Sequence, residues 1–194
     1  MSFAGSIRFV ATNDFHHESS ENDAWMEAAF RQIAKTEGAD FCLGLGDLAN
    51  SGKLESLETM QRLAQLARMP FYPAVGNHDL DDTGDAANYA AVFPNRFNYT
   101  FTQNGWQIVV VDSTDGVIWE NSTISESTLA WLDSTLPTLD PLAPTILATH
   151  FPLAAEVTFS PRNPEDMLTR FEPLNLRGVF CGHYHANTIT QHGG

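Results

Sequence analysis

The stretch FCLGLGDLANSGKLESLETMQRLAQLARMPFYPAVGNHD, residues 41–79, decides the fold. It begins with an apolar run, residues 41–47, that is typical of a buried strand. Leucines at helical spacing follow between Lys53 and Met69, and Pro70 marks the end of the predicted helix. Residues 71–77 then form a second short apolar strand. A strand–helix–strand unit of this kind indicates an α/β domain in which helices cover a sheet.

Strand and helix patterns alternate on both sides of this stretch. The predicted strands are residues 7–14, a hairpin over 99–113, 144–150 and 178–183, and the predicted helices are residues 23–37, 125–136 with Ser125 as N-cap, and a short one near 165–171. The pair Asn104-Gly105 between two β-rich runs is a strong hairpin signal. We expect this hairpin to make the sheet mixed or to split it into two packed sheets. Residues 79–98 are expected to form a polar loop.

The composition indicates one globular domain over residues 1–194. Hydrophobic residues make up 43% of the chain and include 13 phenylalanines, which is enough to fill a core. The formal net charge is −14, and the ten lysines and arginines are scattered. Such a surface repels the phosphates of DNA and RNA, so we expect no long nucleic acid as a partner. A small anionic substrate stays open, because bound metals can invert the local potential.

The two cysteines and the N-terminus bear on the compartment. Cys42 and Cys181 both lie in apolar runs, and we interpret them as buried free thiols rather than a disulfide. The segment MSFAGSIRFV has neither the basic nor the long apolar region of a signal peptide. Since no apolar run approaches the ~20 residues that span a bilayer, we expect a cytoplasmic protein without membrane attachment.

Side chains with oxygen or nitrogen donors follow almost every predicted strand. Ligand sites of α/β sheets gather outside the carboxyl ends of the strands, so these distant segments are expected to converge. The candidate metal ligands are Asp14, His16, Asp47, Asn77, His150, His183 and His185. They are too many for one tetrahedral zinc, and they include no thiolate. The set suits two divalent ions, Mn, Fe or Zn, that share one carboxylate.

The order of these motifs resembles that of a known family. D-x-H, G-D, G-N-H-D, H and G-H-x-H run from Asp14 to His185 in the order of the calcineurin-like metallophosphoesterases. Each motif alone is weak, but five in order are specific. The pattern is most similar to the bacterial class III cyclic-nucleotide phosphodiesterase branch. The resemblance implies a four-layer αββα sandwich with two mixed β-sheets flanked by helices.

The resemblance also implies a role for each residue. The first ion would be held by Asp14, His16 and His185; the second ion would be held by Asn77, His150 and His183, with Asp47 as the bridge. His78 would contact the phosphate and protonate or stabilise the leaving oxygen, and Asp79 would orient His78. The implied reaction is hydrolysis of a small phosphodiester, such as a cyclic nucleotide, by in-line attack of a metal-bridging hydroxide.

Two other functions stay open at this point. One is a phosphomonoesterase of small metabolites, and the other is a scaffold that keeps the fold without turnover. A scaffold of this kind tends to lose His78 or a metal ligand, and here every position is filled. The purple branch of the family lacks the D-x-H histidine, and the protein-phosphatase branch carries extra arginines. His16 is present here, and residues 48–52 contain no arginine, so neither branch is favoured.

Several residues near the motifs have two interpretations. Phe15 and Phe151 belong either to the core or to a pocket for a flat group. Asn50 is a loop residue or lies beside the site, and Tyr184 packs or forms a rim. A further set is expected to be solvated: His17, His192 and the acidic cluster Asp81, Asp82 and Asp85, which we interpret as a loop rather than a third metal site.

The C-terminal segment differs from the family pattern. Family members continue past G-H-x-H with strands that finish the second sheet, whereas this chain ends nine residues after His185. Residues 187–191 have the pattern of one strand, and residues 192–194 that of the start of a turn. We therefore expect a sandwich without its last C-terminal strands, either as a truncation or as a short variant. In the second case an exposed sheet edge pairs with another subunit.

Overall fold

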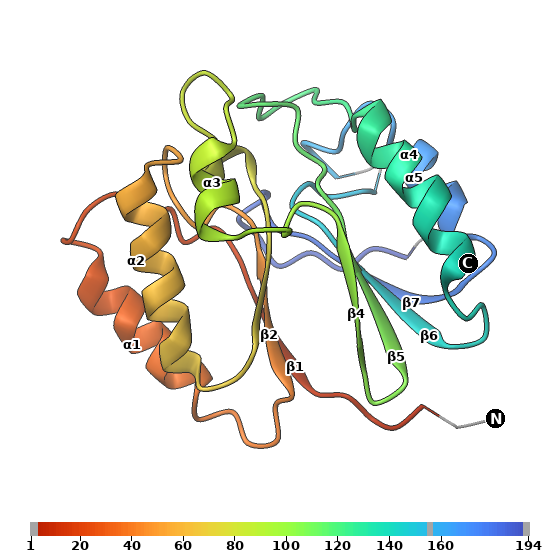
Figure 1. Ribbon diagram of the computed structural model, residues 1–194, viewed down its shortest axis with the longest axis horizontal. Coiled ribbons are helices and arrows are strands. Elements are labelled where there is room, and N and C mark those ends of the chain that lie inside the picture. The colour runs from red at the N-terminus through yellow and green to blue at the C-terminus, as the bar shows by residue number, and fades with distance from the viewer. Residues whose placement is uncertain (1–3, 155–156, 192–194) are drawn as a thin grey trace.

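The computed structural model describes residues 4–154 and 157–191, which form two sheets between two layers of helices. In Figure 1 the helices α1, α2 and α3 cover one side and the helices α4 and α5 cover the other, with the strands between them. The expected αββα sandwich is confirmed. Four single turns of 3₁₀ helix complete the described elements: Gln65–Ala67, Asn77–Asp79, Leu136–Thr138 and Thr169–Phe171.

The first sheet consists of three parallel strands in the order β1-β2-β3. Its elements are β1 (Phe9–Thr12), α1 (Asp23–Ile33), β2 (Phe41–Leu45), α2 (Leu54–Ala64) and β3 (Phe71–Ala74). All five residues of β2 are buried, because helices cover one face and the second sheet covers the other. We predicted two mixed sheets, and this one is purely parallel over the described strands, since each connection is a helical crossover.

The second sheet is mixed and has the order β4-β5-β6-β7. Its strands are β4 (Tyr99–Gln103), β5 (Trp106–Val110), β6 (Pro144–Ala148) and β7 (Asn175–Phe180). The strands β4 and β5 form the predicted hairpin, and Asn104 and Gly105 take the positive φ values of 48° and 84° that such a two-residue turn requires. The strands β5, β6 and β7 run parallel to one another.

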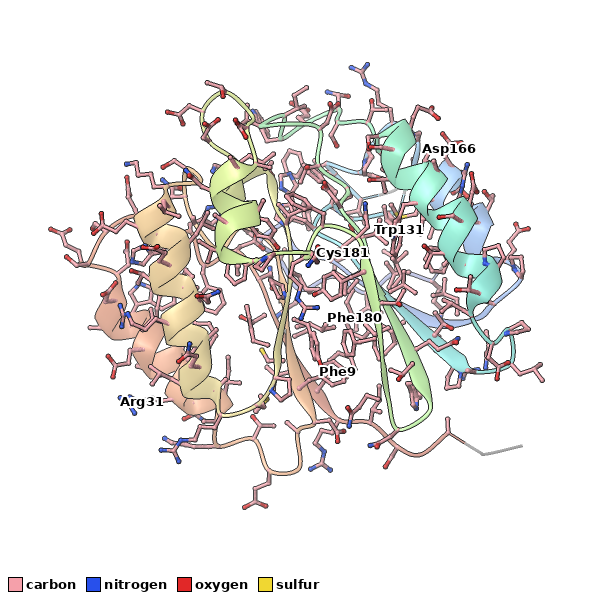
Figure 2. All side chains as sticks on the ribbon, viewed as in Figure 1. Phe9, Arg31, Trp131, Asp166, Phe180 and Cys181 are labelled. Atoms are coloured by element: carbon pink, nitrogen blue, oxygen red, sulfur yellow. The ribbon has the colours of Figure 1, made fainter. Side chains whose placement is uncertain are left out.

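Three apolar layers hold the sandwich together. The middle layer lies between the sheets and contains Phe41, Ile108 and Ile146. Figure 2 labels Phe9 and Phe180, which meet there with ring centroids 5.1 Å apart. One outer layer packs helices on the first sheet, and the other packs α4 (Glu126–Thr135) and α5 (Pro164–Leu168) on the second. Adjacent residues of β5 face opposite layers, as the period of a strand requires.

Two segments differ from the expectations. The predicted loop over residues 79–98 contains a short helix, α3 (Ala87–Val92), which buries Tyr89 and Val92. Residues 187–191 were expected to form a strand and do not, so β7 is an edge strand of the second sheet among the described residues. The expected cap of α4 is confirmed, because the Thr128 amide donates to Ser125 Oγ at 3.2 Å.

Both cysteines are free thiols, as predicted, with Cys42 buried and Cys181 half-buried. Among the described residues, no helix has the length and apolar character needed to cross a bilayer.

Candidate metal centre

The predicted ligands converge where the carboxyl ends of strands from both sheets meet. Main-chain hydrogen bonds join these ends: the Asp14 amide donates to the Gly46 carbonyl at 3.1 Å, and the Gly182 amide donates to the His150 carbonyl at 2.9 Å. The first contact joins two loops of the first sheet, and the second joins two loops of the second sheet. The seven side chains are therefore placed by the sandwich as a whole.

The first group of donors consists of Asp14, His16 and His185. His185 Nε2 lies 3.2 Å from His16 Nε2 and 3.3 Å from Asp14 Oδ1. Donor atoms that share one ion at bonds of about 2.0–2.2 Å lie roughly 3–3.5 Å apart. The spacing of this group therefore fits a divalent ion.

The second group of donors surrounds the fully buried His150. Its Nε2 lies 3.2 Å from Asn77 Oδ1, 3.2 Å from His183 Nδ1 and 3.3 Å from Asp47 Oδ2. These separations again match donors around one ion. Imidazole, carboxylate and amide oxygens are ligands that suit Mn, Fe and Zn.

Asp47 belongs to both groups through one atom. Its Oδ2 lies 3.3 Å from His150 Nε2 and 3.6 Å from His16 Nε2, so it faces both groups. Its Oδ1 accepts a hydrogen bond from the His78 amide at 2.9 Å, which fixes the carboxylate in this orientation. A carboxylate in this position can bridge two ions, which is the role that the family resemblance implied for Asp47.

Main-chain carbonyls set the tautomers of two histidines. The Nδ1–H of His150 donates to the Leu45 carbonyl at 2.8 Å, and the Nε2–H of His183 donates to the Trp119 carbonyl at 2.8 Å. The other nitrogen of each ring then faces the second group: His150 Nε2 lies beside Asn77 and Asp47, and His183 Nδ1 lies beside His150 Nε2. Such second contacts orient metal-binding histidines and raise their basicity. Sequence analysis missed both carbonyls, because a backbone acceptor leaves no pattern in the sequence.

Burial and charge act together on the protonation of the centre. Burial alone would raise the pKa of Asp47, yet His150 and the His78 amide outweigh it and lower that pKa to about 2. For His150, burial opposes protonation, but Asp47 raises the pKa to about 9. Burial lowers the pKa of His16 and of His183, which favours neutral rings. A histidine must be neutral to coordinate a metal, so metal binding releases the His150 proton.

Most of the candidate ligands have left-handed backbones. Five of the seven have positive φ: Asp14 at 53°, His16 at 48°, Asp47 at 52°, His183 at 66° and His185 at 52°. Non-glycine residues in this region are uncommon, and each costs of order 1–3 kcal/mol. Strain of this kind clusters at functional sites, where the surrounding structure maintains it.

Two glycines allow the donors to approach each other. Gly46 has φ of 90°, and a Cβ on it would lie 2.5 Å from His150 Nδ1. A Cβ on Gly76 would overlap the amide and carboxylate of Asp47. Glycine is therefore required before Asp47 by close contact and by φ, and before Asn77 by close contact alone.

His78 lies at the centre, but its partner is not the predicted one. Its ring centroid is 4.7 Å from that of His16, and its Nδ1 lies 2.8 Å from the Asn50 carbonyl. The expectation that Asp79 contacts His78 is wrong. The carboxylate of Asp79 is fully buried and accepts the amides of Ala49 and Gly76, each at 2.9 Å. It therefore braces the loops that carry Asp47 and His78.

The buried position of Asp79 changes the pKa of its carboxyl group. Burial and the charge of Asp47 together raise the pKa of Asp79 to about 7, against the two amide donors that lower it. Asn50, for which two interpretations were open, lies beside the site and contributes its carbonyl.

The remaining candidates that the structure describes supply no donor atom to the two groups. Phe15 and Phe151 are core residues with 6% and 0% exposure, and the Phe151 ring packs against His183 with centroids 4.2 Å apart. His17 was expected to be solvated and is instead buried, with Nε2 2.8 Å from Asp23 Oδ1. Asp81 accepts hydrogen bonds from three groups of its own loop, on Thr83 and Asp85, as expected of a self-contained loop. His192 falls outside the described residues.

A sequence profile of the calcineurin-like phosphoesterases matches residues 7–187. The chain belongs to the calcineurin-like phosphoesterase family. Members of this family are phosphoester hydrolases that use divalent metal ions, and the chain carries donor groups for that chemistry.

Individual relatives agree with the family. The chain is 33% identical over 115 residues to a 3′,5′-cyclic-nucleotide phosphodiesterase of Nostoc sp., covering 58% of this chain and 41% of that protein. It is 24% identical over 157 residues to a probable cyclic nucleotide phosphodiesterase of Fibrobacter succinogenes, covering 75% of this chain and 57% of that protein. The chain thus spans about half the length of these curated relatives.

A solved structure confirms the fold of this calcineurin-like phosphoesterase. The purple acid phosphatase of yellow lupin seeds superposes with a TM-score of 0.67 at 16% identity, over 94% of this chain and 38% of that one. At this identity the likeness concerns the fold alone.

Proposed function

We propose that this phosphoesterase hydrolyses a small phosphodiester, such as a cyclic nucleotide. The observation that carries the proposal is the single oxygen, Asp47 Oδ2, that faces two groups of donors with His78 beside them. This arrangement suits two adjacent ions and one proton-transfer group. The names of the two curated relatives support a cyclic nucleotide as substrate.

We assign the donors to two ions in the way that the family resemblance implies. Asp14, His16 and His185 would hold one ion, Asn77, His150 and His183 would hold the other, and Asp47 would bind both. Two adjacent divalent ions supply a Lewis-acid clamp for in-line displacement at phosphorus. The protein keeps the donors in place through the Leu45 and Trp119 carbonyls and the Asp79 brace.

His78 is proposed to act on the leaving group. Its Nδ1–H donates to the Asn50 carbonyl, so its Nε2 is the atom that exchanges a proton with substrate. A protonated Nε2 can give its proton to the leaving alkoxide, which otherwise departs poorly. This assistance matters most for diesters with basic leaving groups. A phosphomonoesterase of small metabolites is the alternative reaction, and a scaffold without turnover is the non-enzymatic alternative.

The partners proposed for the whole molecule follow from charge and topology. A net charge of −14 favours a small phosphorylated substrate over a long nucleic acid. Among the described strands β7 lies at an edge of the second sheet, and we propose that it pairs with another subunit. The oligomeric state, measured by light scattering, tests that pairing, and the cytoplasmic location stays a prediction.

Hydrolysis of two chromogenic esters tests the proposal. Protein loaded with Mn²⁺ is expected to cleave bis(p-nitrophenyl) phosphate faster than p-nitrophenyl phosphate. The variant Asp47→Asn should lose nearly all activity, and His78→Gln should lower kcat by about 10²–10⁴-fold. The matched control is Asp82→Asn, which removes an exposed charge of a nearby loop and should keep full activity.

The outcomes separate the candidates. A faster rate on the monoester favours the phosphomonoesterase. Metal binding without turnover of either ester favours the scaffold. Full activity in Asp47→Asn contradicts the proposed centre altogether.

A further inference from the structure

Three aromatic side chains from separate loops gather beside the metal centre: Trp119, Phe159 and Tyr184, here called the aromatic platform. The Phe159 ring lies between the others, with centroids 5.7 Å from Trp119 and 6.1 Å from Tyr184. It also stands edge-on to the candidate ligand His183, with centroids 5.4 Å apart. The platform therefore contacts the second group of donors through the His183 ring.

The platform is fastened to the centre through the backbone. The carbonyl of Trp119 accepts the hydrogen bond that fixes the His183 tautomer, so its loop cannot move away without releasing that ring. Tyr184 lies between His183 and His185 in the chain. The position of the platform relative to the donors is thus set by the contacts that set the donors.

The platform is exposed although its rings are largely apolar. Trp119 is 56% exposed and Tyr184 is 36% exposed. Val117 and Ile118, in the same loop as Trp119, are also exposed. Leaving such rings in water forfeits the stabilisation that burial would give, about 25 cal/mol per Å² of apolar surface. Exposed apolar groups next to a polar centre mark a binding surface rather than a core.

The backbone of the platform is strained at its middle residue. Phe159 has φ of 70°, which is an outlier for a bulky aromatic residue. The strain is maintained while the ring packs against His183 and both other rings. Positions that keep such strain are enriched at ligand sites.

We infer that the aromatic platform stacks against a planar heteroaromatic group of the substrate, and so selects nucleobase-bearing phosphoesters over purely aliphatic ones. This inference rests on the proposed function and adds to it the residues that choose the substrate. The bound group is neutral and flat, so the acidic surface of the protein does not oppose it. The phosphate lies at the donors, and the base lies one sugar ring away, over the platform.

Binding, rather than turnover, tests the inference. Protein loaded with Mn²⁺ is titrated calorimetrically with adenosine 5′-monophosphate and with ribose 5-phosphate, which has the same phosphate and sugar without the base. Stacking of one base on aromatic side chains corresponds to about 5- to 150-fold in affinity. The wild type should therefore bind the nucleotide at least about fivefold more tightly than the sugar phosphate.

Variants assign this preference to the platform. Trp119→Leu keeps the carbonyl that holds His183 and should reduce the nucleotide affinity to that of ribose 5-phosphate, whose own affinity is unchanged. Trp119→Phe should retain most of the preference. The matched control is Trp25→Leu, because Trp25 is 50% exposed but stacks on Phe15. This control should leave both affinities as in the wild type.

Three results of these titrations would overturn the inference. They are equal wild-type affinities for adenosine 5′-monophosphate and ribose 5-phosphate, no binding of the nucleotide at millimolar concentration, and an unchanged preference for the nucleotide in Trp119→Leu. A change of oligomeric state in Trp119→Leu, seen by light scattering, would mean that another subunit covers the rings. Failure of the proposed function is recognised separately, because it appears as absent hydrolysis while the binding preference persists.

Discussion

At the scale of single residues, Ser113 illustrates how one hydroxyl supports the metal centre. Ser113 is fully buried, and its Oγ accepts the amide of Phe151, the residue after His150. The substitution Ser113→Ala leaves that amide buried without an acceptor. We expect the free energy of unfolding to fall by about 1–3 kcal/mol, measured by urea denaturation of chelated protein.

The control for this prediction is Ser134→Ala. Ser134 is exposed on α4 and its hydroxyl donates to the Trp131 carbonyl of the same helix. Its loss should change the free energy of unfolding by no more than about 0.5 kcal/mol. Equal effects of the two substitutions would contradict the role given to Ser113.

Asp112 gives a prediction with a pH dependence. Burial raises the pKa of Asp112, although the amide and hydroxyl of Thr114 both donate to its Oδ1 at 2.8 Å. A carboxyl with a raised folded pKa is disfavoured as the anion, so its ionisation lowers stability as pH rises through the unfolded and then the folded pKa. Asn keeps the acceptor oxygen and cannot ionise. We therefore expect Asp112→Asn to have a higher free energy of unfolding than the wild type at pH 7.

Urea denaturation of chelated protein at pH 7 and at pH 4 measures this difference. The advantage of Asp112→Asn should shrink at pH 4, where more of the wild-type carboxyl is protonated in the fold than at pH 7. An equal difference in the free energy of unfolding at pH 7 and at pH 4 would show that the charge of Asp112 does not cause it.

The sequence predicts side chains better than it predicts their partners. The seven donors were recognisable because each is a chemically distinctive residue at the end of an apolar run. The acceptors of His150, His183 and His78 are main-chain carbonyls, whose positions depend on the folded path of distant loops. The role of Asp79 beside His78 was implied by the family resemblance, but two residues adjacent in a tight turn point in different directions.

At the scale of elements, Gly76 determines how closely the β3 loop approaches the β2 loop. A Cβ on Gly76 would overlap the backbone and the side chain of Asp47. Gly76 has no positive φ, so a substitution there adds this steric contact without adding backbone strain. We expect Gly76→Ala to displace Asp47 and to weaken Mn²⁺ binding by at least about tenfold, as other changes to supporting contacts do. Isothermal titration of Mn²⁺ measures this effect.

Gly178→Ala is the control for this element. Gly178 lies in β7, and its added Cβ would touch only the Phe180 ring, at 3.4 Å. This variant should bind Mn²⁺ as the wild type does. Wild-type affinity in Gly76→Ala would contradict the close approach.

Elements with strong apolar patterns were predictable, and those defined by tertiary contacts were not. The strands β2, β5 and β6 are buried apolar runs, and the sequence located them. The helix α3 lies in a polar segment and exists because Tyr89 and Val92 pack under it. Residues 187–191 alternate like a strand, but they pair with none of the described strands, and a strand forms only as part of a sheet.

At the scale of the whole molecule, the metal centre joins the two sheets. Asp14, Asp47 and Asn77 follow strands of the first sheet, whereas His150 and His183 follow strands of the second. Ions bound between them should therefore stabilise the entire sandwich. A free ion at a hundred times its Kd adds about 2.7 kcal/mol to the free energy of unfolding. For a chain of this size each kcal/mol raises Tm by roughly 2–4 °C.

Differential scanning calorimetry with and without Mn²⁺ measures this increment. Asp47→Asn should abolish most of it, while Asp82→Asn should keep it in full. An equal increment in Asp47→Asn would mean that the ion stabilises the protein at some other place.

The left-handed backbones of the candidate ligands have a consequence for how this architecture can change. Asp, Asn and His are the side chains that tolerate positive φ best after Gly, and they are also the ligands found here. Cys or Glu at a position with positive φ would add a backbone conformational penalty, whatever the strength of its bond to the ion. The polypeptide itself therefore restricts which ions the centre can come to prefer, and natural variation should interchange Asp, Asn and His far more readily than it introduces Cys or Glu.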